Sequence, residues 1–210
     1  MEGSRRYCKL WSTVDTASKF EVAMSGSEID AFLSDICQDT QNSVNSMLVN
    51  IDVGKSRAYN PTDEKQIKEA VQKTVGFATL NKIVFEQLRS WMVDTAKSRL
   101  EASPDDLSLM TALGELYKGQ GKFGDAEPLL LRALEKRRET LGELHLDTLK
   151  SVNLAAILYR LKEDYERATP LHKAALKGYR HVRGDSHPDT MIAMSNLAVL
   201  YQRRRCGAVI

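Results

Sequence analysis

"GDSHPDTMIAMSNLAVLY", residues 184–201, repeats much of an earlier stretch, "GELHLDTLKSVNLAAILY", residues 142–159. The two stretches lie 42 positions apart and align without a gap. They share the pattern Gly-x-x-His-x-Asp-Thr near the start and Ala-x-Leu-Tyr at the end. A fixed period of roughly 20–50 residues is typical of stacked supersecondary units. The chain from about residue 104 onward is therefore predicted to be a repeat array.

Each repeat is predicted to be a pair of helices. Leu149, Val152, Ala156 and Tyr159 follow the spacing i, i+3, i+7, i+10 of one helix face. In the next segment Pro170 lies early, where a missing backbone N–H costs little. Small residues recur where the two helices must approach closely, as at Gly114, Ala126, Ala156, Ala168 and Ala198.

The array divides into two complete units and one partial unit. The complete units cover residues 104–145 and 146–187, and the partial unit covers 188–203. Because the partial unit has only its first helix, we expect Leu200 and Val199 to have no following helix to cover them. The residues expected to pack inward on the helix before it are Met191, Met194, Leu197, Ala198 and Tyr201. Uncovered apolar surface predicts self-association through this truncated C-terminal repeat.

Composition and charge argue against several classes of function. The 210 residues are 42% hydrophobic and 28% charged, with a net charge of +2, so the strong basic bias of a nucleic-acid-binding protein is missing. Cys8, Cys37 and Cys206 are odd in number and far apart, which predicts neither a disulfide framework nor a metal site. No apolar run approaches the roughly 20 residues of a membrane span. We expect a cytoplasmic protein that does not bind membranes.

Residues 1–103 show no such repeat and are predicted to be mainly helical. A short run at 19–25 is compatible with one strand. Ser27 and Asp30 suggest a capping box for a helix that starts in "SEIDAFLSDICQDT", and Pro61 and Gly76 bracket a second helix. The third and longest helix is predicted over 77–103, with one apolar stripe formed by Leu80, Val84, Leu88, Trp91 and Thr95.

The repeats resemble the tetratricopeptide repeats of kinesin light chains. The resemblance covers about 104–201 and is carried by four features. These are a small residue at the eighth position of the first helix, an aromatic residue at the eleventh, "DAEPLLLRAL" at the start of the second helix, and the "G(D/E)xHxDT" junction. The 42-residue period strengthens the resemblance, because ordinary tetratricopeptide repeats have a period of about 34 residues. It implies an α-helical solenoid whose first helices line a concave groove.

In that groove, polar residues offset from the packing positions are expected to face a peptide. Kinesin-light-chain-like repeats place asparagines here, and an amide offers both a donor and an acceptor to a peptide backbone. The predicted groove residues are Ser108, Thr111, Glu115, Lys118, Lys150, Asn153, Arg160, Ser195, Asn196 and Gln202. We therefore predict a non-enzymatic scaffold that binds a short segment of a protein partner.

An alternative places an enzyme or signalling regulator in the N-terminal region, with the repeats as its recruiting arm. Residues 1–103 also resemble the tail of a Toll/interleukin-receptor-like domain, through Tyr7-Cys8 and the "FEVAM" run. The resemblance implies a catalytic glutamate three residues after the cysteine in members that cleave NAD, and Trp11 stands there instead. The region is therefore interpreted as a truncated remnant, and no enzymatic activity is carried over.

Two local patterns invite a chemical interpretation that we do not favour. "DVGKS" at 52–56 ends like a phosphate-binding loop, but Val49 stands where the first glycine of such a loop is needed. His145 and His187 occupy equivalent positions and are expected to help form the turn between repeats. His172 and His181 have no carboxylate or cysteine at ligand spacing. No catalytic residue, metal or cofactor is predicted.

Overall fold

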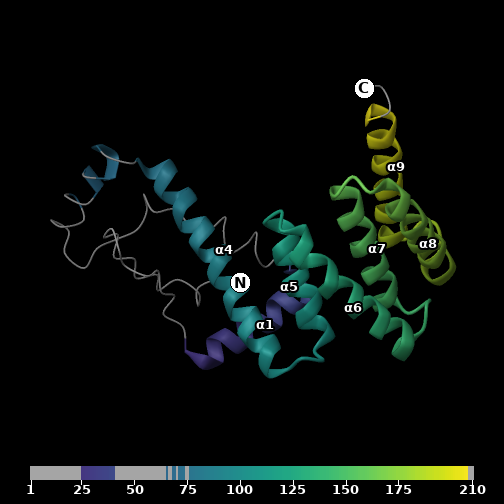
Figure 1. Ribbon diagram of the computed structural model, residues 1–210, viewed down its shortest axis with the longest axis horizontal. Helices are drawn as coiled ribbons and strands as arrows, with labels where there is room; N and C mark the ends of the chain where they lie inside the picture. Colours follow the sequence, from purple (N-terminus) through teal and green to yellow (C-terminus); the bar gives the residue numbers. More distant parts are fainter. Residues whose placement is uncertain (1–24, 41–64, 66–67, 70, 74–75, 208–210) are drawn as a thin grey trace. The chain divides into compact units, whose positions relative to one another are not determined.

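The computed structural model describes residues 25–40, 65, 68–69, 71–73 and 76–207. Over these residues all regular secondary structure is helical, which confirms the predicted mainly α fold class (Figure 1). The chain divides into two compact units, Met1–Arg99 and Leu100–Ile210. The expected strand and the "DVGKS" loop both lie outside the described residues, except for Ser25 at the end of the strand.

The first described helix, α1 (Gly26–Gln38), begins two residues earlier than the capping box predicted from the sequence. Ser25 is the cap: its hydroxyl accepts from the N–H of Glu28, and the Glu28 carboxylate accepts from the Ser25 N–H at 2.8 Å. The predicted capping box of Ser27 and Asp30 is wrong, because the longer Glu28 side chain reaches back to the cap backbone at Ser25.

Helix α4 (Phe77–Ala102) buries a stripe with a spacing of four residues. The prediction is confirmed for Leu80, Val84 and Leu88, which are buried. It is wrong beyond them, because Met92 and Ala96 continue the buried stripe while Trp91 and Thr95 are half-buried. The Trp91 ring instead lies beside that of Phe32 on α1, with ring centroids 5.3 Å apart.

Five helices of the second unit form two consecutive antiparallel pairs and a single last helix, and each helix packs against the next (Figure 1). They are α5 (Leu107–Gly119), α6 (Phe123–Leu141), α7 (Leu146–Leu161), α8 (Tyr165–Arg183) and α9 (Pro188–Gly207). Helices α6 and α8 start 42 residues apart, as do α7 and α9. The solenoid predicted from the period is therefore confirmed.

The two helices of a pair approach each other closely at positions that hold alanine or glycine. Ala126, Ala156 and Ala168 have no exposed surface, as expected for the small positions. At Gly114 a Cβ would lie 2.7 Å from the Leu130 side chain. Gly178, which the repeat pattern does not single out, is tighter, because a Cβ there would lie 2.2 Å from Leu149 Cδ2. Both glycines are needed for packing.

The turns between units are capped by histidine. The Nδ1 atom of His145 accepts from the Asp147 N–H at 3.2 Å, and His187 does the same for Asp189 at 3.1 Å. The histidines therefore help form these turns, as expected. Asp147 lies two residues after His145, in the first turn of α7, and its carboxylate lies 3.7 Å from Lys150 Nζ.

The prediction for the two sides of α9 is confirmed for Val199, which is 36% exposed, and is wrong for most of the other residues. Leu200, expected to be uncovered, has no exposed surface and packs against Tyr159 and Ala168. Met191 and Tyr201, expected to pack inward, are 57% and 40% exposed. The inward side of α9 faces the preceding pair, as the equivalent Leu158 does in α7. Ala198 is exposed, while Met194 and Leu197 are half-buried.

Among the described helices, none combines the length and the apolar character that a membrane span requires.

Candidate peptide-binding surface

Three of the four predicted groove residues on α5 have side-chain partners within the chain. Ser108 is exposed, and its backbone N–H donates to the N-cap residue Asp106 at 3.0 Å. Glu115 and Lys118 form an ion pair at 3.2 Å, with side chains only 18% and 13% exposed. In this unit the charged groups of the predicted groove therefore neutralise each other.

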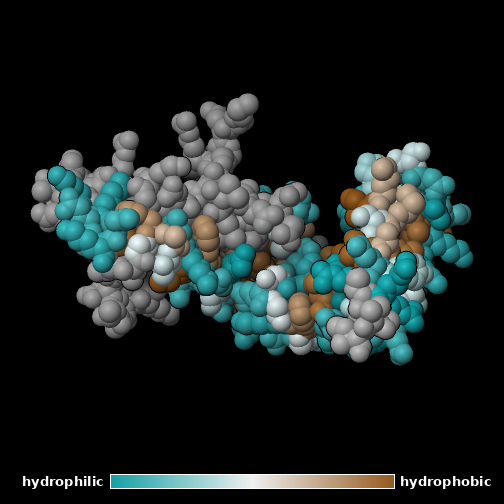
Figure 2. Space-filling view, turned by 90° about the horizontal axis from the view of Figure 1, so that it is seen from above, coloured by the Kyte–Doolittle hydropathy of each residue, from teal (hydrophilic) through white to brown (hydrophobic). Residues whose placement is uncertain are grey.

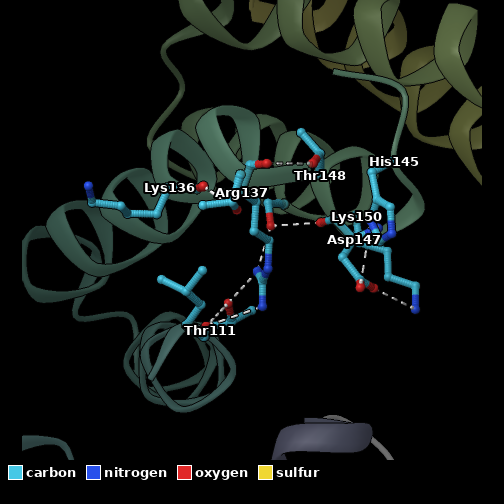
Figure 3. Close-up of polar contacts among 10 residues, drawn as sticks. Thr111, Lys136, Arg137, His145, Asp147, Thr148 and Lys150 are labelled. Atoms are coloured by element: carbon cyan, nitrogen blue, oxygen red, sulfur yellow. Dashed lines mark hydrogen bonds and ion pairs between the residues drawn. The ribbon is translucent and has the colours of Figure 1, made fainter. Parts of the chain in front are cut away.

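The fourth residue on α5, Thr111, belongs to a polar junction that sequence reasoning missed (Figure 3). Arg137 on α6 donates to Thr111 Oγ1 at 2.7 Å, to Ser151 Oγ on α7 at 2.6 Å and to the Leu107 carbonyl at 3.2 Å. Burial lowers the pKa of Arg137, and Asp147 and Asp106 oppose that shift. One guanidinium group thus joins three helices.

Comparison of the repeats does not reveal this junction, because the residue equivalent to Arg137 in the next unit makes apolar contacts. The position 42 residues after Arg137 is Tyr179, which is buried among Leu134, Val152 and Ala193. Burial raises the pKa of Tyr179 to about 12. The same place in two successive units is therefore held by hydrogen bonds in one and by apolar contacts in the other.

A second polar junction joins α6, α7 and α8 at Glu127. The Tyr159 hydroxyl donates to Glu127 Oε1 at 3.0 Å, Lys162 donates to Oε2, and Arg167 lies 3.2 Å away. The hydrogen bond from Lys162 is the largest cause that lowers the pKa of Glu127. The Arg167 guanidinium also lies 4.3 Å from the centre of the Tyr159 ring. Both polar junctions join neighbouring helices of the scaffold.

On α7 and α9 the structure brings two predicted groove residues together. The Nδ2 atom of Asn196 donates to Asn153 Oδ1 at 3.1 Å, although the two residues are 43 apart in sequence. The same offset of 43 relates Arg160 to Arg203, and the charge of Arg203 acts on Arg160. The two helices therefore present parallel rows of residues in matching order.

We call this surface the α7–α9 strip. It comprises Asn153, Ile157 and Arg160 on α7 and Asn196, Val199 and Arg203 on α9. The asparagine pair lies at one end, the two arginines lie at the other, and Ile157 and Val199 lie between them by helical spacing. Ile192 continues the α9 row and is 55% exposed. Figure 2 shows hydrophobic residues at the surface among hydrophilic ones in this part of the chain.

The remaining predicted groove residues lie on exposed surface. Lys150 is exposed beside Asp147, and Ser195 and Gln202 are exposed on α9. The apolar members of the strip were missed, because the prediction selected polar residues only. The helical spacing from Asn153 and Asn196 would have found them.

Beneath the arginine end of the strip lies His172 on α8, another residue that the sequence did not single out for this surface. Its ring has no exposed surface, and neither ring nitrogen has a hydrogen-bond partner in the described part of the chain. Burial first, and then the charge of Arg160, lowers the pKa of His172 to about 4. The imidazole is therefore neutral at physiological pH.

Within the described ranges, no three His, Cys, Asp or Glu side chains gather closely enough to hold a metal ion.

The fold and the strip together define an α-helical repeat scaffold of the solenoid class. A tetratricopeptide repeat family model matches residues 105–181 and again 151–206. Residues 105–206 are therefore tetratricopeptide repeats, a family that generally mediates protein–protein interaction.

The chain is also similar to a solved structure, that of BtubC (BKLC) from P. vanneervenii. The two are 16% identical, and the match has a TM-score of 0.47. The match covers 85% of this chain and spans 65% of the length of the solved chain. Among curated proteins, none matches this sequence.

Proposed function

We propose that this chain is a non-enzymatic scaffold whose α7–α9 strip binds a short extended segment of a protein partner. The Asn153–Asn196 pair is the observation that supports the proposal most directly. Each amide has both donors and an acceptor, and the bond between them uses one donor of Asn196 and the acceptor of Asn153. The Asn153 NH2 group and the Asn196 carbonyl oxygen are left to pair with a peptide backbone.

The apolar middle of the strip supports the same proposal. Ile157 is half-buried and Val199 is 36% exposed, so both offer apolar surface beside the amide pair. Backbone hydrogen bonds at fixed positions combined with apolar contacts for side chains are how extended peptides are recognised. Three of the four predicted residues on α5 do not contribute, because Thr111, Glu115 and Lys118 are bound to one another or to Arg137.

We also propose that the repeats are of the kinesin-light-chain-like type. The support is the 42-residue spacing of helix starts, which separates them from repeats with the ordinary period of about 34 residues. In this proposal residues 104–210 are the interaction module of a cytoplasmic protein, and residues 1–103 carry no catalytic activity. Purified protein is expected to consume no NAD, and turnover would favour the alternative of an N-terminal enzyme.

The binding proposal can be tested with the full chain on an array of short synthetic peptides. We expect a subset of peptides to bind the wild type and to lose binding in the double variant Asn153→Ala, Asn196→Ala. Lys177→Ala, an exposed change on α8, is the matched control and should bind like the wild type. Unchanged binding by the double variant, with wild-type helicity by circular dichroism, would show that the strip is not the peptide site.

A further inference from the structure

The turn between α4 and α5 carries an exposed serine that is followed by a proline. Ser103 comes directly after Ala102, the last residue of α4, and Pro104 comes next. Residues 101–106 are all exposed. Among the described residues, the Ser103 hydroxyl has no hydrogen-bond partner. Its oxygen is therefore accessible to a reacting group from outside the chain.

The backbone around Ser103 can open at little cost. A residue that precedes proline is disfavoured in the helical conformation and favours an extended one, which accounts for the end of α4 at this point. The Ser103 N–H donates to the Leu100 carbonyl at 3.2 Å, and the Ser103 carbonyl accepts from the Asp106 N–H at 3.2 Å. Opening the turn into an extended segment breaks these two hydrogen bonds, and water replaces them because the turn is exposed.

A second hydroxyl residue before a proline shows what the surroundings of Ser103 add. Of the five prolines in the sequence, Pro104 and Pro170 follow a serine or a threonine. Thr169 lies inside α8, is half-buried, and its Oγ1 donates to the Tyr165 carbonyl at 2.6 Å. An extended segment around Thr169 would require α8 to unfold locally. The same dipeptide pattern is therefore accessible at Ser103 and protected at Thr169.

We propose that Ser103 is a phosphorylation site for a proline-directed protein kinase. Kinases of this class bind an extended segment with proline directly after the serine, a residue that has no N–H to leave unpaired. In the reaction Ser103 Oγ bonds to the γ-phosphorus of ATP, and the bond from that phosphorus to the bridging oxygen of the leaving ADP breaks. The hydroxyl proton passes to the catalytic aspartate of the kinase. The inference is independent of the α7–α9 strip.

The structure also provides a cation for the new phosphate. Arg132 on α6 donates to Asp105 at 2.9 Å, and Asp105 lies two residues after Ser103. This ion pair is weak, because the two side chains are 54% and 90% exposed. A phosphoserine carries a charge of about −1.5 to −2 and three acceptor oxygens, so it competes with Asp105 for the guanidinium group. Phosphorylation is thus expected to attach the turn more firmly to α6.

The site can be tested by incubating the full chain with ATP and purified proline-directed kinases of the cyclin-dependent and mitogen-activated classes. Mass spectrometry is expected to find phosphate on Ser103 and none on Thr169. Pro104→Ala should lower the initial rate at Ser103 by about tenfold or more. Ser98→Ala, which removes an exposed serine of α4 that no proline follows, is the matched control and should react like the wild type.

Two results would overturn the proposed site. The first is a folded wild-type chain in which neither kinase class phosphorylates Ser103. The second is an unchanged rate at Ser103 in a Pro104→Ala variant that is folded by circular dichroism. A synthetic peptide of residues 98–108 serves as the reference, and Ser103 should react in the chain within about tenfold of its rate in the peptide, because the turn opens easily.

The role of Arg132 has its own measurement. In NMR spectra of the full chain, we expect the Arg132 Nε–H signal to shift when Ser103 is phosphorylated. Arg138, which pairs with Glu135 at 2.9 Å and with Glu143 at 3.2 Å, is the internal control and should not shift. An unchanged Arg132 signal in the phosphorylated chain would show that the phosphate does not take this cation from Asp105.

Discussion

His172 makes the stability of the array depend on pH. Its pKa falls from 6.5 to about 4 because the ring is buried and Arg160 lies nearby. Between these two values the unfolded chain binds a proton that the folded chain does not. The contribution of His172 is therefore intact above about pH 6.5, and stability is lost as the pH falls from there toward about 4.

We expect His172→Leu to remove this dependence, because Leu130 fills the equivalent buried position. Between about pH 7.5 and about pH 5, the wild type should lose about 2 kcal/mol more stability than the variant. Urea unfolding at the two pH values measures the difference. Equal losses in both proteins would show that His172 is protonated in the folded state.

Gly178 is predicted to be destabilised by any added side chain. A Cβ there would lie 2.2 Å from Leu149 Cδ2, so the buried Leu149 side chain would have to shift within the core. Gly178→Ala should lower the free energy of unfolding by about 1–3 kcal/mol. Gly124→Ala on α6, where no atom lies within 4 Å of the added Cβ, is the matched control. Gly124→Ala should stabilise the protein slightly, because alanine favours helices. Thermal unfolding of both variants measures the two changes in stability.

At the scale of the helix, Arg137 determines how firmly α5 is attached to the array. Arg137→Ala removes the hydrogen bonds to Thr111 and Leu107 on α5 and to Ser151 on α7. We expect a loss of about 2 kcal/mol and faster hydrogen exchange in α5 than in α8.

Arg138→Ala is the control for that variant. Arg138 pairs with Glu135 at 2.9 Å and with Glu143 at 3.2 Å, and both carboxylates are largely exposed. Its loss should cost at most about 1 kcal/mol and leave exchange in α5 unchanged. If the two variants had the same effect on α5, the junction at Arg137 would have no special role.

The helices could be predicted from the sequence, but the contacts between them could be predicted only in part. The helices are predicted by the 42-residue period, by the apolar spacing and by small residues such as Ala156. These features describe the local geometry of a helix pair, which each unit repeats. The Arg137 junction joins residues as far apart as 30 positions, and the same place in the next unit holds Tyr179. Alignment of the units reveals only the contacts that they have in common, and the Arg137 junction occurs in one unit only.

The error on α9 has a different physical origin. Leu200 and Tyr201 are neighbours in sequence, but successive residues in a helix point about 100° apart. Leu200 faces the pair before it, whereas the equivalent of Tyr201, Tyr159, is covered by α8 and α9. Apolar character alone does not distinguish these two directions. In the same way, the predicted polar groove could not show that Thr111 and Glu115 have partners within the chain.

At the scale of the whole molecule, the exposed side of α9 predicts self-association. Met191, Ala198 and Tyr201 are exposed, whereas their equivalents Leu149, Ala156 and Tyr159 are buried. Exposed apolar residues at positions built to receive a helix favour contact with another copy. We therefore expect the sedimentation coefficient of the wild type to rise with protein concentration.

The double variant Met191→Gln, Tyr201→Gln should sediment as a monomer at the same concentrations. Leu141→Gln with Val182→Gln is the matched control, because these residues are exposed to a similar degree, 45% and 41%, elsewhere in the array. The control should associate like the wild type. A wild-type chain that stays monomeric throughout would contradict the prediction.

Equivalent positions of two successive units hold Arg137 and Tyr179, so the stability of the two units is expected to depend differently on temperature. Burial of Tyr179 against Ala193 is apolar, and near room temperature its driving force is largely entropic, so it weakens on cooling. The hydrogen bonds of Arg137 do not depend on that entropy. Cooling therefore loosens the junction between α8 and α9 relative to the one that joins α5, α6 and α7. The end of the array that carries the strip is expected to be the more cold-sensitive end.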